Sequence, residues 1–173
     1  RFQCPLLPPG TALNITLQGP DGFTAGPVVS VMQAADPELF TLGATTQGVI
    51  LVGATNELAV LGSQAVASRP ARAGESLTIY ASGLGDFSGN VPVGTAAPLD
   101  LPIRLQNRIR VVVDGIEIDP IFAGLAPGMA GLSQVNFQLP RNIQSGPAVP
   151  LYVQVILPDG TVVESNEVTA AIQ

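Results

Sequence analysis

Short runs of alternating apolar and polar residues recur along the chain, and turns rich in Gly and Pro separate them. Residues 13–17, 77–81 and 151–157 alternate with a period of two. This spacing places every second side chain on the same face of a β-strand. The apolar stretches 49–52 and 58–61 flank a polar turn segment. The pattern predicts short antiparallel strands, with a hairpin over the last two stretches.

The strongest local signal is a hairpin over residues 108–119. Asp114 and Gly115 form a dipeptide that favours a type I′ turn. Because residues that face each other across a hairpin share one face of the sheet, this turn also fixes which residues pair. The expected pairs are Val113 with Ile116 and Val111 with Ile118 on the buried face, and Val112 with Glu117 and Arg110 with Asp119 on the other face.

Helical periodicity is weak. Only residues 28–39 have room for a short helix, and Pro37 interrupts them, because proline restricts the residue before it to extended conformations. Strands and helices do not alternate, so a parallel α/β sheet is disfavoured. Many short strands with frequent turns predict an all-β, immunoglobulin-like β-sandwich, with part of a second similar β module.

Three features occur twice in the same order, which indicates a repeated module. The segment Phe-Gln-Cys-Pro at residues 2–5 matches Phe-Gln-Leu-Pro at residues 137–140, and a Pro/Gly segment follows each. An alternating strand and a Pro-Asp-Gly turn come next, at residues 20–22 and 158–160. The offset between the two copies changes only from 135 to 138 residues.

This repeat divides the chain into three parts. We expect residues 1–35 to be the C-terminal strands of a first, incomplete Ig-like module and residues 36–70 to be a connecting β-hairpin segment. Residues 71–173 would then form a complete Ig-like sandwich. The sequence begins at Arg1 without a Met, and we expect the rest of a larger polypeptide upstream.

Composition supports a folded chain and narrows its partners. Hydrophobic residues make up 46% of the chain and charged residues 12%, so a core can form. The net charge is −6 and no basic run occurs, which argues against a nucleic-acid partner. The longest apolar run, residues 49–52, is too short to span a membrane, so no membrane insertion is expected. Cys4 is the only cysteine and is expected to be a small buried hydrophobe.

The residue types that most enzymes need are missing. The sequence has no His and no Lys, which removes the commonest general base, the Ser-His-Asp triad and Schiff-base chemistry. Thirteen carboxylates remain, and a glycosidase site needs a pair of them. Most stand in predicted turns, as Asp21 and Asp159 do, or on outward strand faces. We expect no catalytic residues. A glycosidase that uses a pair of carboxylates remains as a third hypothesis, after the two binding or structural ones stated at the end of this section.

A glycine-rich loop over residues 83–90 carries the candidate binding residues. It follows a strand but cannot open a helix toward a phosphate, so no cofactor is expected. Asp86, Ser88 and Asn90 alternate and offer hard oxygen ligands, which makes them candidates for calcium. Phe87 stands between two polar residues and is the candidate aromatic for binding at an exposed surface.

Three segments resemble a known bacterial family. Residues 36–41 are Asp-Pro-Glu-Leu-Phe-Thr, residues 74–85 are Gly-Glu-Ser-Leu-Thr-Ile-Tyr-Ala-Ser-Gly-Leu-Gly, and residues 122–128 are Phe-Ala-Gly-Leu-Ala-Pro-Gly. They resemble the uncharacterised Solibacter-type C-terminal domain family, an Ig-like domain at the ends of large secreted proteins. The chain departs from the family at Ser133, where Tyr is usual, and lacks its Asn-x-Asp-Gly turn within residues 49–61. The resemblance implies a fold and a location, and it brings no catalytic residues.

Together these features predict a non-catalytic Ig-like module of a secreted or cell-surface bacterial protein. Its expected work is spacing, surface attachment (adhesion) or protein–protein contact, as one of several tandem repeats. Its expected partners are a protein or a surface glycan. The alternative is a carbohydrate- or calcium-binding sandwich, with its site in the loops at residues 86–90 and 122–131.

Overall fold

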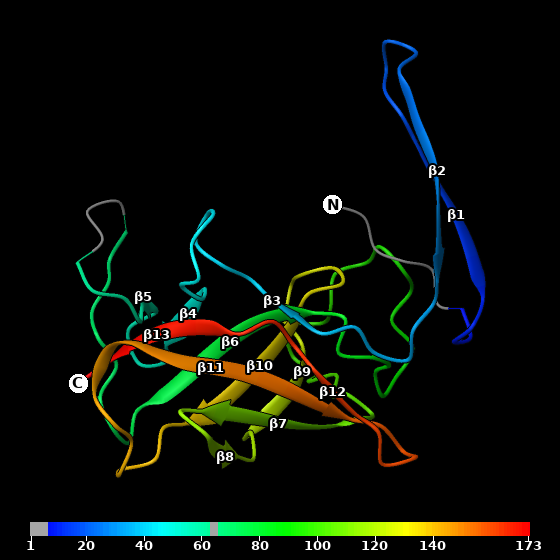
Figure 1. The fold of residues 1–173 in the computed structure, drawn as a ribbon. Helices are drawn as coiled ribbons and strands as arrows, with labels where there is room; N and C mark the ends of the chain where they lie inside the picture. The colour runs from blue at the N-terminus through cyan, green and yellow to red at the C-terminus, as the bar shows by residue number, and fades with distance from the viewer. Residues whose placement is uncertain (1–6, 63–65) are drawn as a thin grey trace.

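The computed structural model describes residues 7–62 and 66–173, and these residues form thirteen strands and no helix (Figure 1). The predicted all-β class is therefore confirmed. Cys4 and the segment 2–5 lie outside the described residues. In chain order the strands are β1 (Ala12–Gln18), β2 (Thr24–Val31), β3 (Glu38–Leu39), β4 (Ile50–Val52), β5 (Glu57–Leu58), β6 (Ser76–Ser82), β7 (Arg108–Val113), β8 (Ile116–Ile118), β9 (Phe122–Leu125), β10 (Ser133–Gln138), β11 (Gly146–Ile156), β12 (Val162–Glu164) and β13 (Val168–Ile172).

Two larger antiparallel sheets make up the body of the molecule. The first has the order β5-β4-β6-β10-β9. A sixth strand of this sheet, β3, also pairs with β6. The second has the order β12-β11-β7-β8, and β13 pairs with β11. No helix forms over residues 28–39, since β2 extends to Val31 in register with β1 and β3 begins at Glu38.

The two sheets share one hydrophobic core, as the layers of a β-sandwich do. Buried positions alternate with more exposed ones along β6, along β10 and, from Val149 onward, along β11, so each turns one apolar face inward. Phe137 is the largest side chain that is completely buried. The other core residues on β6, β7, β10 and β11 are Leu77, Ile79, Ala81, Ile109, Val111, Val113, Val135, Val149, Leu151, Val153 and Val155.

The segment 36–70, interpreted from sequence as a connecting hairpin, supplies three strands to the first sheet. β3 and β4 both pair with β6, and β5 pairs with β4. Leu39, Ile50 and Val52 from this segment are buried in the shared core. The described part of residues 35–173 is called the two-sheet body below.

The hairpin at Asp114 and Gly115 forms as predicted. Both residues have positive φ, 49° and 75°, as a type I′ turn requires. The pairs on both sides of the turn also match, with Val113 opposite Ile116, Val111 opposite Ile118 and Val112 opposite Glu117.

The predicted contact between Arg110 and Asp119 is wrong. Arg110 forms an ion pair with Glu117 at 2.8 Å, and Arg108 forms one with Asp119 at 3.1 Å. Each arginine therefore pairs with a carboxylate that lies diagonally across the hairpin, not directly opposite. The arginine side chain is long enough to reach this diagonal position.

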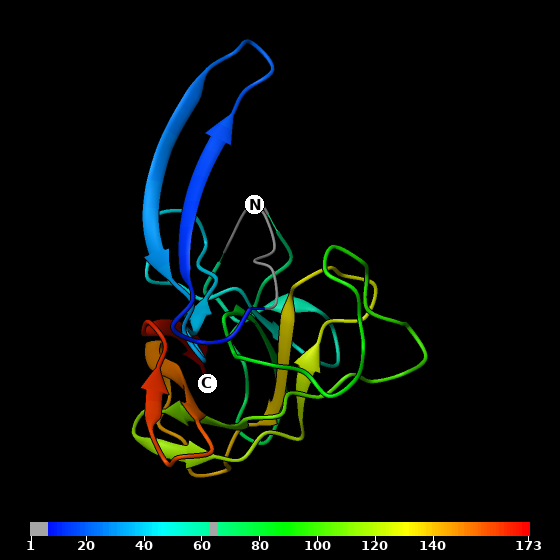
Figure 2. The same ribbon diagram turned by 90° about the vertical axis from the view of Figure 1, so that its right-hand side faces the viewer.

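The β1–β2 hairpin stands apart from the two-sheet body (Figures 1 and 2). It forms a two-stranded sheet of its own. Several of its apolar side chains are exposed to solvent, among them Leu17, Phe23, Val28 and Val29.

The last strand, β13, connects parts of the chain that are far apart in sequence. Its backbone bonds to Thr46 and Gly48, which lie between β3 and β4, and to Ala59 and Ala71, which lie between β5 and β6. Just before β13, the Asn166 carboxamide accepts a hydrogen bond from the Leu39 N–H at 2.7 Å and donates one to the Leu39 carbonyl at 3.1 Å. Leu39 is buried, so these two bonds satisfy backbone groups that water does not reach.

We expect Asn166→Ala to lower the free energy of unfolding by about 1–3 kcal/mol, because it leaves both Leu39 backbone groups without a partner. Asn90→Ala, at an exposed loop position, is the matched control and should change stability by less than about 0.5 kcal/mol. Urea unfolding followed by circular dichroism measures both. Equal stability of the two variants would show that the Asn166 bridge does not tie β3 to the C-terminal strand.

Candidate functional site

The inner face of the first sheet packs in the core. The outer face points away from the core and carries polar and aromatic side chains. Tyr80 on β6 and Gln134 on β10 are directly paired across the strands. Both are half-buried and share the outer face. The Gln134 carboxamide also donates a hydrogen bond to the Asn136 side chain at 2.9 Å. This face therefore presents a phenol beside an ordered pair of amides.

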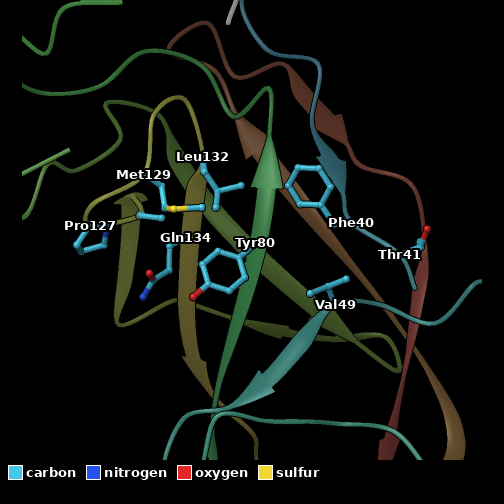
Figure 3. Close-up of a pocket in the computed structure, with 9 residues that line it drawn as sticks. Phe40, Thr41, Val49, Tyr80, Pro127, Met129, Leu132 and Gln134 are labelled. Carbon is cyan, nitrogen blue, oxygen red and sulfur yellow. The ribbon is translucent and has the colours of Figure 1, made fainter. Parts of the chain in front are cut away.

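Beside this pair lies an open depression of about 610 Å³ (Figure 3). Its lining comes from β6, β10, the connection between β3 and β4, and the loop between β9 and β10. In Figure 3 the Tyr80 ring lies between Gln134 and Val49. The lining residues are Phe40, Thr41, Val49, Tyr80, Ala126, Pro127, Met129, Leu132 and Gln134.

None of these nine side chains is charged. The Phe40 and Tyr80 rings offer apolar surface, and Met129 is half exposed at the rim. Hydrogen bonds can come from the Tyr80 hydroxyl, the Thr41 hydroxyl and the Gln134 carboxamide. The depression is thus suited to stacking and hydrogen bonding with a neutral ligand.

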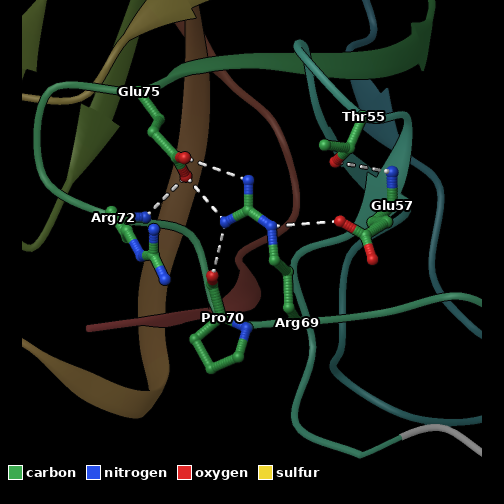
Figure 4. A network of polar contacts seen from close by, with 6 residues as sticks. All are labelled: Thr55, Glu57, Arg69, Pro70, Arg72 and Glu75. Carbon is green, nitrogen blue, oxygen red and sulfur yellow. Dashed lines mark hydrogen bonds and ion pairs between the residues drawn. The ribbon is translucent and has the colours of Figure 1, made fainter.

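A second polar cluster is centred on Arg69 (Figure 4). Its guanidinium donates to Glu57 Oε2 at 3.0 Å and to both Glu75 oxygens at 2.9 Å. The Arg72 N–H adds a bond to Glu75 at 2.8 Å. All three charged side chains are about a quarter to a third exposed. The cluster ties the first residue of β5 to the chain that enters β6.

The electrostatics of this cluster favour a structural role. The Arg69 hydrogen bonds, together with the bond from the Arg72 N–H, lower the pKa of Glu75, and they outweigh the opposing effect of burial. A glycosidase acid needs the opposite, a carboxyl whose pKa is raised so that it holds its proton near neutral pH. Glu57 and Glu75 are instead both bound to one cation.

The loop that carries the predicted calcium ligands does not reach the depression. The Ser88 hydroxyl donates to the Arg104 carbonyl at 2.9 Å, while Asp86 and Asn90 are exposed. In the described part of the chain, no group of three His, Cys, Asp or Glu side chains could hold a metal ion. The Ser88 hydroxyl thus ties the loop to the backbone at Arg104, and calcium binding by Asp86, Ser88 and Asn90 stays a prediction.

Phe87 is half-buried rather than exposed. Its backbone forms an isolated antiparallel β-bridge with Leu105. Its side chain packs on a small second cluster formed by Ala97, Ile103 and Leu125. Its ring therefore anchors the loop to the body. Of the two predicted site loops, residues 122–131 do contribute to the depression, through Ala126, Pro127 and Met129.

Sequence reasoning missed Tyr80, Phe40 and Gln134 as candidate site residues. One signal was available, since Tyr80 occupies a position of β6 that alternation turns away from the core. Its meeting with Phe40 depends on the pairing of β6 with β3, which the local pattern does not encode.

Comparisons of the chain with protein-family models, with curated proteins and with solved structures find no match. The family resemblance of the sequence therefore stays a prediction. Among the residues that the structure describes, no helix has the length and apolar character needed to cross a membrane.

The Arg69 cluster predicts a contribution to stability that depends on pH. The pKa of Glu75 is lower in the folded chain than its ordinary value of 4.5, so its stabilisation is complete above that pH and is lost as the pH falls through the folded pKa. Glu75→Gln should lower the free energy of unfolding at pH 7 by about 1 kcal/mol. The difference from the parent chain should shrink below pH 4.5.

Urea unfolding between pH 7 and pH 3 measures this difference. Glu167→Gln, at an exposed position, is the control and should match the parent throughout. A Glu75→Gln deficit that stays constant down to pH 3 would contradict the linkage.

Proposed function

We propose that this chain is a non-catalytic module of a secreted or cell-surface bacterial protein, with an Ig-like sandwich as its body. Its work is spacing, surface attachment or contact with another protein. The proposal is supported by the residues of the depression and of the Arg69 cluster. The depression is open and uncharged, and the carboxylates Glu57 and Glu75 are held by Arg69.

A spacer or attachment module needs a stable body more than a reactive centre. One core shared by two sheets supports this use, because it makes the body a single packed unit. The β1–β2 hairpin at one end gives the module a contact surface outside that body. The extracellular location rests on the family resemblance of residues 36–41, 74–85 and 122–128.

A carbohydrate-binding module is the second candidate, and the depression favours it. An aromatic ring that lines an open depression beside hydroxyl and amide groups can stack on a sugar and bond to its hydroxyls. Tyr80, Phe40 and Gln134 supply these groups on neighbouring strands. In this alternative the partner is a surface glycan.

The test is a thermal-shift screen of the purified chain against calcium and a panel of neutral oligosaccharides. The leading proposal expects no change in melting temperature with any of them. A ligand at 100 times its dissociation constant would stabilise the fold by about 2.7 kcal/mol, a shift of a few degrees.

Two variants assign any shift that is seen. Loss of the shift in Tyr80→Ala, with the shift kept in Tyr152→Ala on the other sheet, would favour the carbohydrate-binding module. Release of sugar from the panel that stops in Glu57→Gln would contradict the non-catalytic proposal outright.

A further inference from the structure

The β1–β2 hairpin has the same strand register as the hairpin that closes the second sheet. Adding 138 to both residue numbers converts four of the six β1–β2 pairs, two on each side of an irregularity, into pairs of the second hairpin. Leu17 faces Ala25 as Val155 faces Val163, and Leu13 faces Ser30 as Leu151 faces Val168. Sequence similarity indicates one repeated strand and turn, and the structure extends the repeat to the backbone pairing.

The two turns also form the same hydrogen bonds. The Gly22 N–H donates to the Gly19 carbonyl at 3.2 Å, and the Gly160 N–H donates to the Leu157 carbonyl at 2.9 Å. In each turn the aspartate side chain accepts a bond from the backbone N–H two residues later. Gly22 and Gly160 have φ of 83° and 86°, which only glycine adopts readily.

An irregularity falls at the same place in both hairpins. The β1–β2 register shifts by one residue between Ile15 and Leu17. In the later hairpin the register shifts by one residue where β12 gives way to β13, opposite Val153. Bulges of this kind are positional features of a fold, so their agreement indicates the same structural element.

The two hairpins differ in what covers them. On β11 the side chains of Val149, Leu151, Val153 and Val155 are at most 5% exposed, because the first sheet packs over them. On the corresponding face of the first hairpin, Leu13 and Ile15 are only partly buried, and Leu17, Phe23 and Val28 are each more than 60% exposed. Among the residues that the structure describes, no strand pairs with the other edge of β1, where β11 pairs with β7.

The surface of the first hairpin is not adapted to water. Across residues 7–35 the one charged side chain is Asp21, in the turn. Natural sheets usually carry charges on edges and faces that stay exposed. Their absence here indicates that both the face and the edge are covered in the assembled protein.

We propose that the β1–β2 hairpin closes a separate β-sandwich that precedes the two-sheet body in the same polypeptide. In that sandwich a second sheet packs on the apolar face of the hairpin, as β6 and β10 pack on β11 in the two-sheet body. A further strand pairs with the free edge of β1, as β7 pairs with β11. In the two-sheet body the closing hairpin follows the strands that it completes, so the partner strands lie ahead of the hairpin.

A second copy of the chain fits this surface less well. Its own sheets already hold β11 and β13 in the equivalent places. The proposal rests on the repeat of register and turn, and it stands apart from the function of the depression.

The test compares hydrogen exchange in the natural full-length polypeptide and in residues 1–173 alone. The β1 amides that do not bond to β2 should exchange at least about 100-fold more slowly in the full-length polypeptide. Leu17→Asp in the full-length polypeptide should remove this protection and lower the melting transition of the preceding segment only. Leu99→Asp, at an 81% exposed position of the body, should leave both unchanged.

Two results would overturn the proposal. One is equal exchange of the β1 amides in the two proteins, including the case in which no strand-forming segment precedes residue 1. The other is a dimer of residues 1–173 in analytical ultracentrifugation that Leu17→Asp converts to a monomer. That outcome would assign the surface to a second copy.

Discussion

The burial of one face of β11 is the constraint on which the rest of the structure depends. This strand is the longest in the chain, and every second side chain from Val149 to Val155 is removed from water. Such a face requires a second apolar sheet above it, which β6 and β10 supply through Leu77, Ile79, Val135 and Phe137. Each buried aliphatic side chain stabilises the folded chain by about 1.5–3 kcal/mol, and the resulting core holds both sheets without a disulfide.

The same constraint decides where a ligand or partner can bind. Because the inner faces of the two-sheet body are filled by the core, recognition by this body is left to its outer faces and loops. The depression at Tyr80 and Gln134 lies on an outer face. The β1–β2 hairpin repeats the register of the hairpin at β11 but has no sheet above it.

Local features of the fold follow from the sequence, whereas features that join distant segments do not. The turn at Asp114 and Gly115 fixes its own register, since both residues must accept positive φ. The bond between Asn166 and Leu39 joins positions 127 residues apart, and no local pattern encodes it. The depression is likewise missed, because it needs β3, β6 and the loop after β9 to meet. Phe87 shows the converse, since polar neighbours in sequence do not keep its ring in water.

The central claim is that the two sheets form one cooperative body through their shared core. The chain has two tyrosines and no tryptophan, and Tyr80 lies in the first sheet while Tyr152 lies in the second. Urea unfolding of Tyr152→Phe and of Tyr80→Phe, followed by tyrosine fluorescence and by circular dichroism, therefore reports on each sheet separately. The account predicts that the two signals coincide in both variants. A tyrosine transition that separates from the circular dichroism transition in either variant would show that the sheets unfold independently and would contradict it.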